Sequence, residues 1–263
     1  MRRSTSLILG LVFGTIAALT FTASASAQDV REEFHQTYPL AANGAVALHN
    51  LSGSVRITTW DRNEVKVDAT KRADSQQRLN EAKIVVENTS DRVSIKTKYP
   101  SRDWDDDDDH GCCNHVARVD YQVTIPAGAS LDAVKLVSGD LEINGVGGEV
   151  HASSVSGDVQ ATGLRGRAEI SSVSGDVKVT YAGSTDRLRL NSVSGDVTAV
   201  LPGNASAEVS ANTVSGDISN EFGLSVDHGR FVGQHLQGTI GGGTGKIDMH
   251  TVSGEIRLRR AAM

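Results

Sequence analysis

The densest group of potential metal ligands in this chain is a short acidic segment, residues 101–115. Five consecutive aspartates are followed by two histidines and two adjacent cysteines: Asp105, Asp106, Asp107, Asp108, Asp109, His110, Cys112, Cys113 and His115. Imidazole and thiolate groups are ligands for zinc or copper, and carboxylates are ligands for calcium. The repelling carboxylates predict a solvated loop between two strands. Two hypotheses stay open, a divalent-metal site and a loop without a ligand.

A second set of carboxylates belongs to an internal repeat. The core Val-Ser-Gly-Asp-Val occurs, with small variations, six times between residues 136 and 256. Its glycines are Gly139, Gly157, Gly175, Gly195, Gly216 and Gly254, which are separated by 18, 18, 20, 21 and 38 residues. The last interval is about two periods, so residues 236–240 are expected to form a degenerate copy. A fixed period of this length is typical of repeat architectures.

The acidic residue of each core should form a ladder along one edge of the stacked units. Its members are Asp140, Asp158, Asp176, Asp196, Asp217 and Glu255. Neighbours would lie about 4.8 Å apart, which is the spacing of paired strands. The favoured interpretation is that each carboxylate caps its turn by accepting a backbone N–H. Calcium binding between units is the alternative.

The segments beside each core predict strands. Apolar residues alternate with polar ones, as in residues 167–172 and 187–192, which indicates one buried face per strand. A unit of about 19 residues cannot bury this face alone, so stacking must create the core. Val155, Gly157 and Val159 share one parity, and Gly157 either faces inward or takes a positive φ at a corner. We expect an all-β β-solenoid or a closely related stack of repetitive β-sheets.

The chain is expected to have three parts. Residues 1–27 resemble a signal peptide, with Arg2 and Arg3, an apolar run and a small-residue cleavage site. Residues 28–130 should form a less regular β-cap that includes the 101–115 loop, and residues 131–260 the repetitive solenoid. Within the cap, residues 51–55 look like a degenerate first core, and residues 74–83 are a candidate short helix.

The export signal, residues 51–55 with the following 60–65, and the Ser-Gly-Asp cores together resemble the bacterial putative-adhesin family. This β-strand-repeat family is a domain of unknown function. The resemblance covers roughly residues 40 to 258. It implies a right-handed β-helix-like fold, an envelope location and no established catalytic residues. The acidic Cys/His loop does not map onto the family pattern.

Composition narrows the function. The net charge of −6 argues against a nucleic-acid partner, and aromatic residues, which sugar-cleaving β-helix enzymes use, make up only 4%. We expect an exported periplasmic or cell-surface protein that does not span the membrane after signal cleavage. It would be non-enzymatic, adhesin-like or a scaffold or sensor, and bind an envelope protein or glycan surface. A metal-binding envelope protein and a carbohydrate-active β-helix enzyme are the alternatives.

Overall fold

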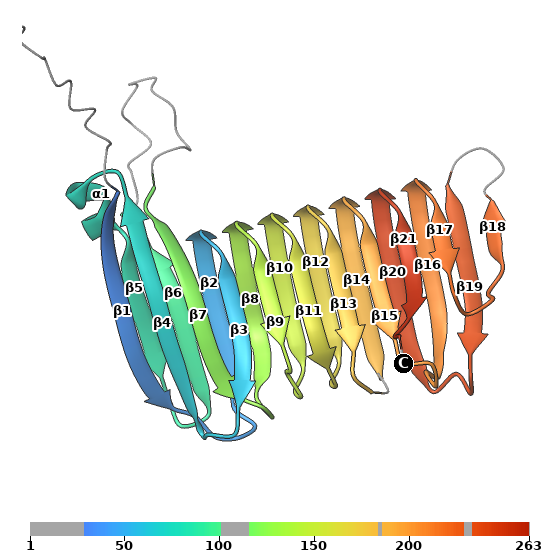
Figure 1. The fold of residues 1–263 in the computed structure, drawn as a ribbon, viewed down its shortest axis with the longest axis horizontal. Coiled ribbons are helices and arrows are strands. Elements are labelled where there is room, and N and C mark those ends of the chain that lie inside the picture. Colours follow the sequence, from blue (N-terminus) through green and yellow to red (C-terminus); the bar gives the residue numbers. More distant parts are fainter. Residues whose placement is uncertain (1–28, 101–115, 184–185, 229–232, 263) are drawn as a thin grey trace, which may run out of the picture.

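A computed structural model describes residues 29–100, 116–183, 186–228 and 233–262, and it shows two long β-sheets that face each other (Figure 1). Sheet A contains, in spatial order, β1 (Val30–Pro39), β4 (Glu64–Ala73), β7 (Arg118–Pro126), β3 (Val55–Trp60), β9 (Leu141–Asn144), β11 (Val159–Leu164), β13 (Val177–Tyr181), β15 (Val197–Leu201), β21 (Ile256–Arg260) and β17 (Ile218–Asn220). Sheet B contains β18 (Val226–His228), β19 (Gln234–Ile240), β16 (Ala207–Ser215), β20 (Gly245–Ser253), β14 (Arg187–Ser194), β12 (Ala168–Ser174), β10 (Val150–Ser156), β8 (Ser130–Ser138), β2 (Ala45–Ser52), β6 (Arg92–Lys98) and β5 (Lys83–Asn88). The expected all-β, solenoid-like repeat fold is confirmed.

Each repeat core is the corner at which one coil passes from sheet B to sheet A. The strand before the core lies in sheet B and the strand after it lies in sheet A, as in β10 and β11. Successive coils pair in parallel and in register, so that Ser154 lies beside Ser172 and Val159 beside Val177. Equivalent positions of the repeat therefore form continuous rows along the stack.

The order of the coils in the stack differs from their order in the chain. The last coil, β20–β21, lies between the coils β14–β15 and β16–β17 and pairs in parallel with both. At the other end, β2–β3 lies between β8–β9 and the strands β6 and β7. Each of these two coils is thus held by a neighbour on both sides.

The interpretation of residues 236–240 as a degenerate core is wrong. These residues belong to β19, which runs antiparallel to β16 and ends sheet B together with β18. The long interval before the last core therefore holds a hairpin that reverses the chain and returns it to the interior of the stack. Residues 51–55, by contrast, do form a core: Gly53 has a φ of 119°, and Ser52 pairs with Ser138.

The short helix lies at the N-terminal end of the stack as α1 (Gln76–Glu81). The side chain of Ser75 accepts a hydrogen bond from the backbone N–H of Arg78, which satisfies one free donor of the first turn. Lys71, which is buried, donates to the carbonyls of Leu79 and Ala82 and pairs with Glu32 at 2.9 Å. This lysine ties the C-terminal end of the helix to sheet A.

Inward-facing aliphatic rows form one continuous core between the two sheets. Ile170 of β12, Leu190 of β14 and Met249 of β20 lie side by side in sheet B and are fully buried. Val159, Val177 and Val197 form the matching row in sheet A. Each row is completed only by its neighbours, which is why a single unit of this length would not fold by itself.

The corner glycine turns the chain with a positive φ, which settles the choice left open by the sequence. Gly157 has a φ of +126° and Gly175 a φ of +138°. A Cβ added to Gly175 would lie 2.3 Å from the carbonyl oxygen of Gly157 in the neighbouring coil. Glycine is therefore required at this position both by the backbone conformation and by the close approach of the next corner.

A buried row of hydroxyl groups lies just before the corner. The hydroxyl groups of Ser192, Thr251 and Thr213 donate to the carbonyl oxygens of corner glycines in neighbouring coils at 3.1–3.3 Å. Among the described residues, the hydroxyl oxygens of Ser154 and Ser172 are buried without a hydrogen-bond partner. Ser154 and Ser172 thus carry a desolvation cost, whereas the hydrogen bonds of the other three hydroxyl groups offset theirs.

The first prediction concerns the corner. Gly175→Ala should lower the free energy of unfolding by about 3 kcal/mol, because the alanine would have to keep a positive φ and displace a backbone carbonyl. Gly203→Ala is the matched control, since a Cβ there meets nothing within 4 Å. Thermal unfolding followed by circular dichroism measures both. Equal midpoints for the two variants would contradict a steric requirement at the corner.

A second prediction separates the members of the hydroxyl row. Thr251→Val should cost about 1 kcal/mol, because the carbonyl of Gly195 loses its donor while the side-chain shape is kept. Ser154→Ala removes a hydroxyl group without a partner and should leave stability unchanged or raise it. Denaturant unfolding of the two variants tests the contrast, which fails if Ser154→Ala is the more damaging change.

Candidate functional site

The acidic ladder is occupied by hydrogen bonds between coils. The Oδ1 atom of Asp158 accepts the backbone N–H of Asp176 at 2.9 Å, and Asp176 accepts that of Asp196 at 2.8 Å. The same bond joins Asp140 to Asp158 and Asp196 to the backbone of Glu255. Each of these four carboxylates, Asp140, Asp158, Asp176 and Asp196, therefore caps the corner of the neighbouring coil rather than its own.

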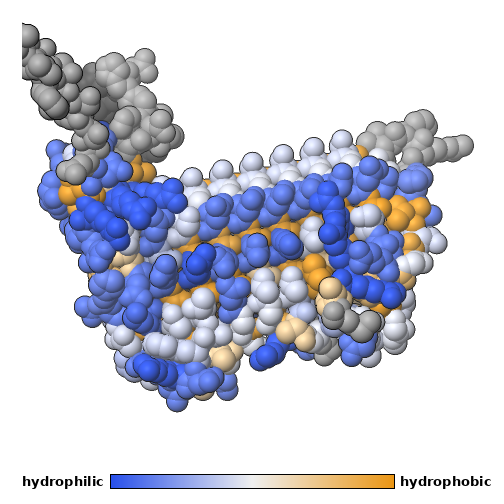
Figure 2. Space-filling view, in the orientation of Figure 1, coloured by the Kyte–Doolittle hydropathy of each residue, from blue (hydrophilic) through white to orange (hydrophobic). Residues whose placement is uncertain are grey.

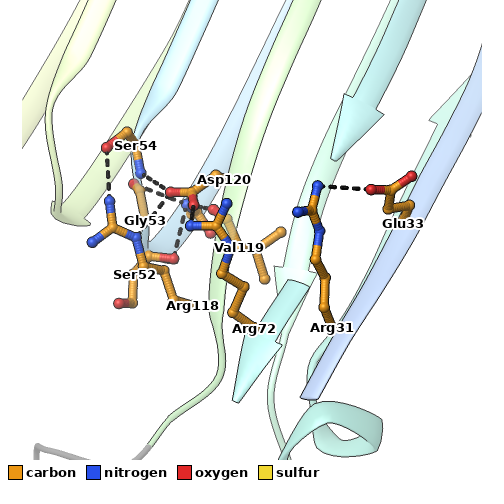
Figure 3. A network of polar contacts seen from close by, with 10 residues as sticks. Arg31, Glu33, Ser52, Gly53, Ser54, Arg72, Arg118, Val119 and Asp120 are labelled. Atoms are coloured by element: carbon orange, nitrogen blue, oxygen red, sulfur yellow. Dashed lines mark hydrogen bonds and ion pairs between the residues drawn. The ribbon is translucent and has the colours of Figure 1, made fainter. Parts of the chain in front are cut away.

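The ladder has different chemistry at its N-terminal end (Figure 3). Asp120 of β7 accepts the backbone N–H of Ser54 at 2.9 Å. Ser54 follows Gly53 at the position where the other cores have Asp or Glu. Arg118 and Arg72 both pair with Asp120, and Arg118 also donates to the hydroxyl group of Ser54 at 3.0 Å. Two cations thus pair with Asp120, which lies before the first residue of the acidic ladder in the stack.

At the other end, a glutamine side chain completes the last corner. Gln234 of β19 donates to Asp217 at 2.7 Å and accepts the backbone N–H of Ile218 at 2.7 Å. The hairpin that ends sheet B therefore also supplies the acceptor that a further coil would have supplied.

Asp196 is the ladder member whose charge is most clearly stabilised. The backbone N–H of Glu255 and the guanidinium of Arg257, at 2.6 Å, lower the pKa of Asp196 from its usual range. A folded-state pKa below the unfolded value means that this contribution to stability is present at neutral pH. It is lost as the pH falls through the folded-state pKa.

Asp196→Asn should therefore lower stability at pH 7 by about 1 kcal/mol, because the amide keeps an acceptor but loses the charge that Arg257 pairs with. The difference from the parent protein should shrink as the pH falls below about 4. Asp61→Asn, at an exposed turn, serves as the control for charge alone. A pH-independent difference between Asp196→Asn and the parent would contradict the assignment. Unfolding midpoints measured from pH 3 to 7 give the answer.

The proposed metal-binding loop, with its aspartates, histidines and cysteines between residues 105 and 115, lies outside the described residues. Within the described ranges, no group of three or more potential ligand side chains is placed to hold a metal ion. Of the two sets of predicted site residues, the structure places the acidic ladder, whose carboxylates cap corners of the stack. The zinc, copper or calcium site in the 105–115 loop stays a hypothesis.

A row of exposed aliphatic side chains runs along sheet B, and sequence reasoning missed it. This aliphatic row consists, in stack order, of Leu51, Val137, Val155, Val173, Val193, Val252 and Val214. The pairs Ser154–Ser172 and Ser156–Ser174 hold Val155 directly beside Val173. The six valines are between 45% and 54% exposed, whereas the Val, Leu or Ile that follows the acidic residue of each core is buried. On the opposite face, that of sheet A, Figure 2 shows the same effect of in-register stacking, with bands of similar hydropathy along the stack.

The signal for the aliphatic row was present in the alternation of sheet B. Ala168, Ile170 and Ser172 face inward, so Val173 must face outward. Val155 and Val159 are an even number of residues apart, which in an unbroken strand would place them on the same face. Because the corner lies between them, Val155 faces outward and Val159 faces inward. Only a knowledge of the corner geometry separates the exposed valine from the buried one.

A polar row lies next to the aliphatic row on the same face. It consists of Lys96, His49, Lys135, Ser153, Ser171, Asn191, His250 and Asn212, which the strand register joins in that order. Partial burial, together with Lys135 and Lys96, lowers the pKa of His49, so this imidazole is neutral at pH 7. The two lysines of the row, Lys96 and Lys135, both lie at its N-terminal end.

The two rows meet a shallow hollow at the C-terminal end of sheet B. Asn212 stands between two histidines, accepting a hydrogen bond from His235 and lying 3.5 Å from a ring nitrogen of His250. Val214 and Val252 form the apolar side of the hollow. Its walls offer amide and imidazole groups beside aliphatic ones, which suits contact with a polypeptide or another mixed surface.

Comparison with known proteins places the chain in a family. Residues 118–259 match the model of the Toastrack DUF4097 family, and the chain belongs to that family. No curated protein matches the chain. Thirteen chains of known structure match it.

Two of the solved structures show the extent of the likeness. A putative cell adhesion protein from Clostridium sporogenes has a TM-score of 0.51 at 14% identity, covering 89% of this chain and 100% of that one. A putative adhesin from Bacteroides fragilis has a TM-score of 0.46 at 13% identity, covering 86% of this chain and 97% of the other. At this identity the first likeness defines a shared fold. The described part of this chain contains no helix with the length and apolar character needed to cross a membrane.

Proposed function

We propose that this protein is an exported, non-enzymatic envelope protein, adhesin-like or a scaffold or sensor, which binds its partner through the aliphatic and polar rows of sheet B. The observation that carries the proposal is the aliphatic row itself. Seven coils in succession expose an aliphatic side chain at one position, while the outward position two residues earlier varies among Ser, Asn, His and Lys. A contiguous exposed apolar strip is typical of an interaction site.

Core formation does not explain the exposed valines. Threonine has the same branching and a similar preference for strands, and it would keep the corner intact while replacing one of the two exposed methyl groups with a hydroxyl group. The inward-facing rows of both sheets are already filled by other residues. The repeated choice of valine therefore supports a role on the outer surface.

A non-enzymatic role is supported by the state of the repeated carboxylates. Hydrolysis of a glycosidic bond requires a pair of carboxylates free to act as acid and base or nucleophile. In the ladder, Asp140, Asp158, Asp176 and Asp196 each accept a backbone N–H from the adjacent coil. The description of the Clostridium sporogenes structure as a cell adhesion protein agrees with this interpretation.

The proposal predicts that methyl groups of the aliphatic row contribute to binding. The triple variant Val155→Thr, Val173→Thr, Val193→Thr should bind isolated envelope preparations of the producing bacterium at least about tenfold more weakly, because each substitution places a hydroxyl group in an apolar contact. Sedimentation of labelled protein with the envelope fraction measures the affinity.

The control for this experiment changes the other sheet. Gln160→Thr with Lys178→Thr alters outward positions of β11 and β13 in sheet A and should leave binding unchanged. Circular dichroism verifies that both variants keep the parent fold. If the triple variant binds as tightly as the parent, the aliphatic row is not the binding surface.

A further inference from the structure

The spacing of the aliphatic row restricts what can cover it. Strand pairing sets its side chains about 4.8 Å apart along the stack. A partner that contacts every position must present apolar groups with the same repeat. Identical rows on two sheets meet this condition and pack into dry interfaces, as they do in cross-β assemblies. A second copy of this chain carries such a row over the same number of coils.

The size of the surface fits a weak but specific contact. Seven positions span about 29 Å, and three adjacent rows of side chains about 7 Å apart cover about 20 Å across the strands. The contact would therefore bury roughly 600 Å² on each copy, or about 1,200 Å² in total, at the lower limit for specific interfaces. This area fits a reversible dimer.

The ends of the stack favour contact along its side. At the N-terminal end, β1 runs antiparallel to β4 and packs Phe34 and Tyr38 against the core. At the C-terminal end, the β18–β19 hairpin and Phe222 and Leu224 cover it. Antiparallel end strands interrupt the parallel repeat, so a second copy could not continue the rows by stacking on either end.

Charge selects the relative direction of the two copies. One side of the aliphatic row is bordered by the acidic ladder beyond the corner, and the other side by the polar row with Lys96 and Lys135. If a two-fold axis runs along the stack, the acidic ladder of each copy lies over the polar row of the other. With antiparallel stacks, the two acidic ladders would face each other and repel.

We propose that the partner of the aliphatic row is a second copy of this chain, bound side by side with its stack axis parallel to the first. The inference rests on the proposed function, because it takes this row as the binding surface and identifies what binds there. The dimer would join equivalent coils, so that Val137 of one copy lies near the same residue of the other.

Analytical ultracentrifugation of the purified protein tests the association. The parent should dimerise reversibly with a dissociation constant between about 1 μM and about 1 mM. The Val155→Thr, Val173→Thr, Val193→Thr variant should dimerise at least about tenfold more weakly, and the Gln160→Thr, Lys178→Thr control should behave as the parent. A parent that stays monomeric, forms open-ended polymers, or dimerises equally well with the threonines overturns the proposal.

Disulfide cross-linking tests the direction. In a Cys112→Ser, Cys113→Ser background, Val137→Cys should form a covalent dimer on mild oxidation, because parallel stacks bring this residue near its own copy. Val173→Cys, at the middle of the row, would also cross-link in antiparallel stacks. Cross-linking of Val173→Cys without that of Val137→Cys therefore overturns the parallel arrangement.

The two proposals fail in different ways. A monomeric parent whose triple variant still loses envelope binding would remove the second copy as partner and leave the proposed function standing. A triple variant that changes neither dimerisation nor envelope binding would remove both.

Discussion

Successive coils approach each other closely at the Ser-Gly-Asp corner, and the rest of the structure depends on this contact. The carbonyl of one corner glycine occupies the space that a Cβ on the next would need, and the following carboxylate accepts a backbone N–H from the next coil. These two contacts fix the distance between successive coils along the stack and the register in which the coils pair. Because the register is fixed there, inward residues meet inward residues along both sheets.

The same corner makes the two faces of sheet B independent of each other. Inward positions must be apolar or, just before the corner, able to donate to a glycine carbonyl. Outward positions before the aliphatic row, such as Ser153, Asn191 and His250, meet no such demand and vary in type. The aliphatic row departs from this variation. Its regularity is the basis of the binding surface proposed for sheet B.

The stack is closed by chain reversal at both ends. The coils β2–β3 and β20–β21 lie inside the stack although they come from near the ends of the described chain. Such insertion gives each of them two parallel neighbours, whereas a coil added in chain order would have one. Antiparallel strands and Gln234 then satisfy the groups that the repeat leaves open. The result is a rod whose exposed repetitive surface lies along its side.

Some features of this protein follow from residue type and spacing alone. The period of the cores predicts stacked β-coils, because units of this length must share a core. The repeated Asp predicts a carboxylate that accepts a backbone N–H, although only the stacking decides that this N–H belongs to the neighbouring coil. Residues 51–55 are recognisable as a core for the same reason. These are local constraints, and the sequence determines them by itself.

Other features were decided only by the tertiary structure. The insertion of β20–β21 depends on a hairpin whose direction no local pattern encodes, so residues 236–240 resemble a core without forming one. The exposure of Val155 and the burial of Val159 depend on how the corner reverses the chain, which parity along the sequence does not record. Position in the stack, rather than residue type, thus decides which valines hold the fold together and which remain available for binding.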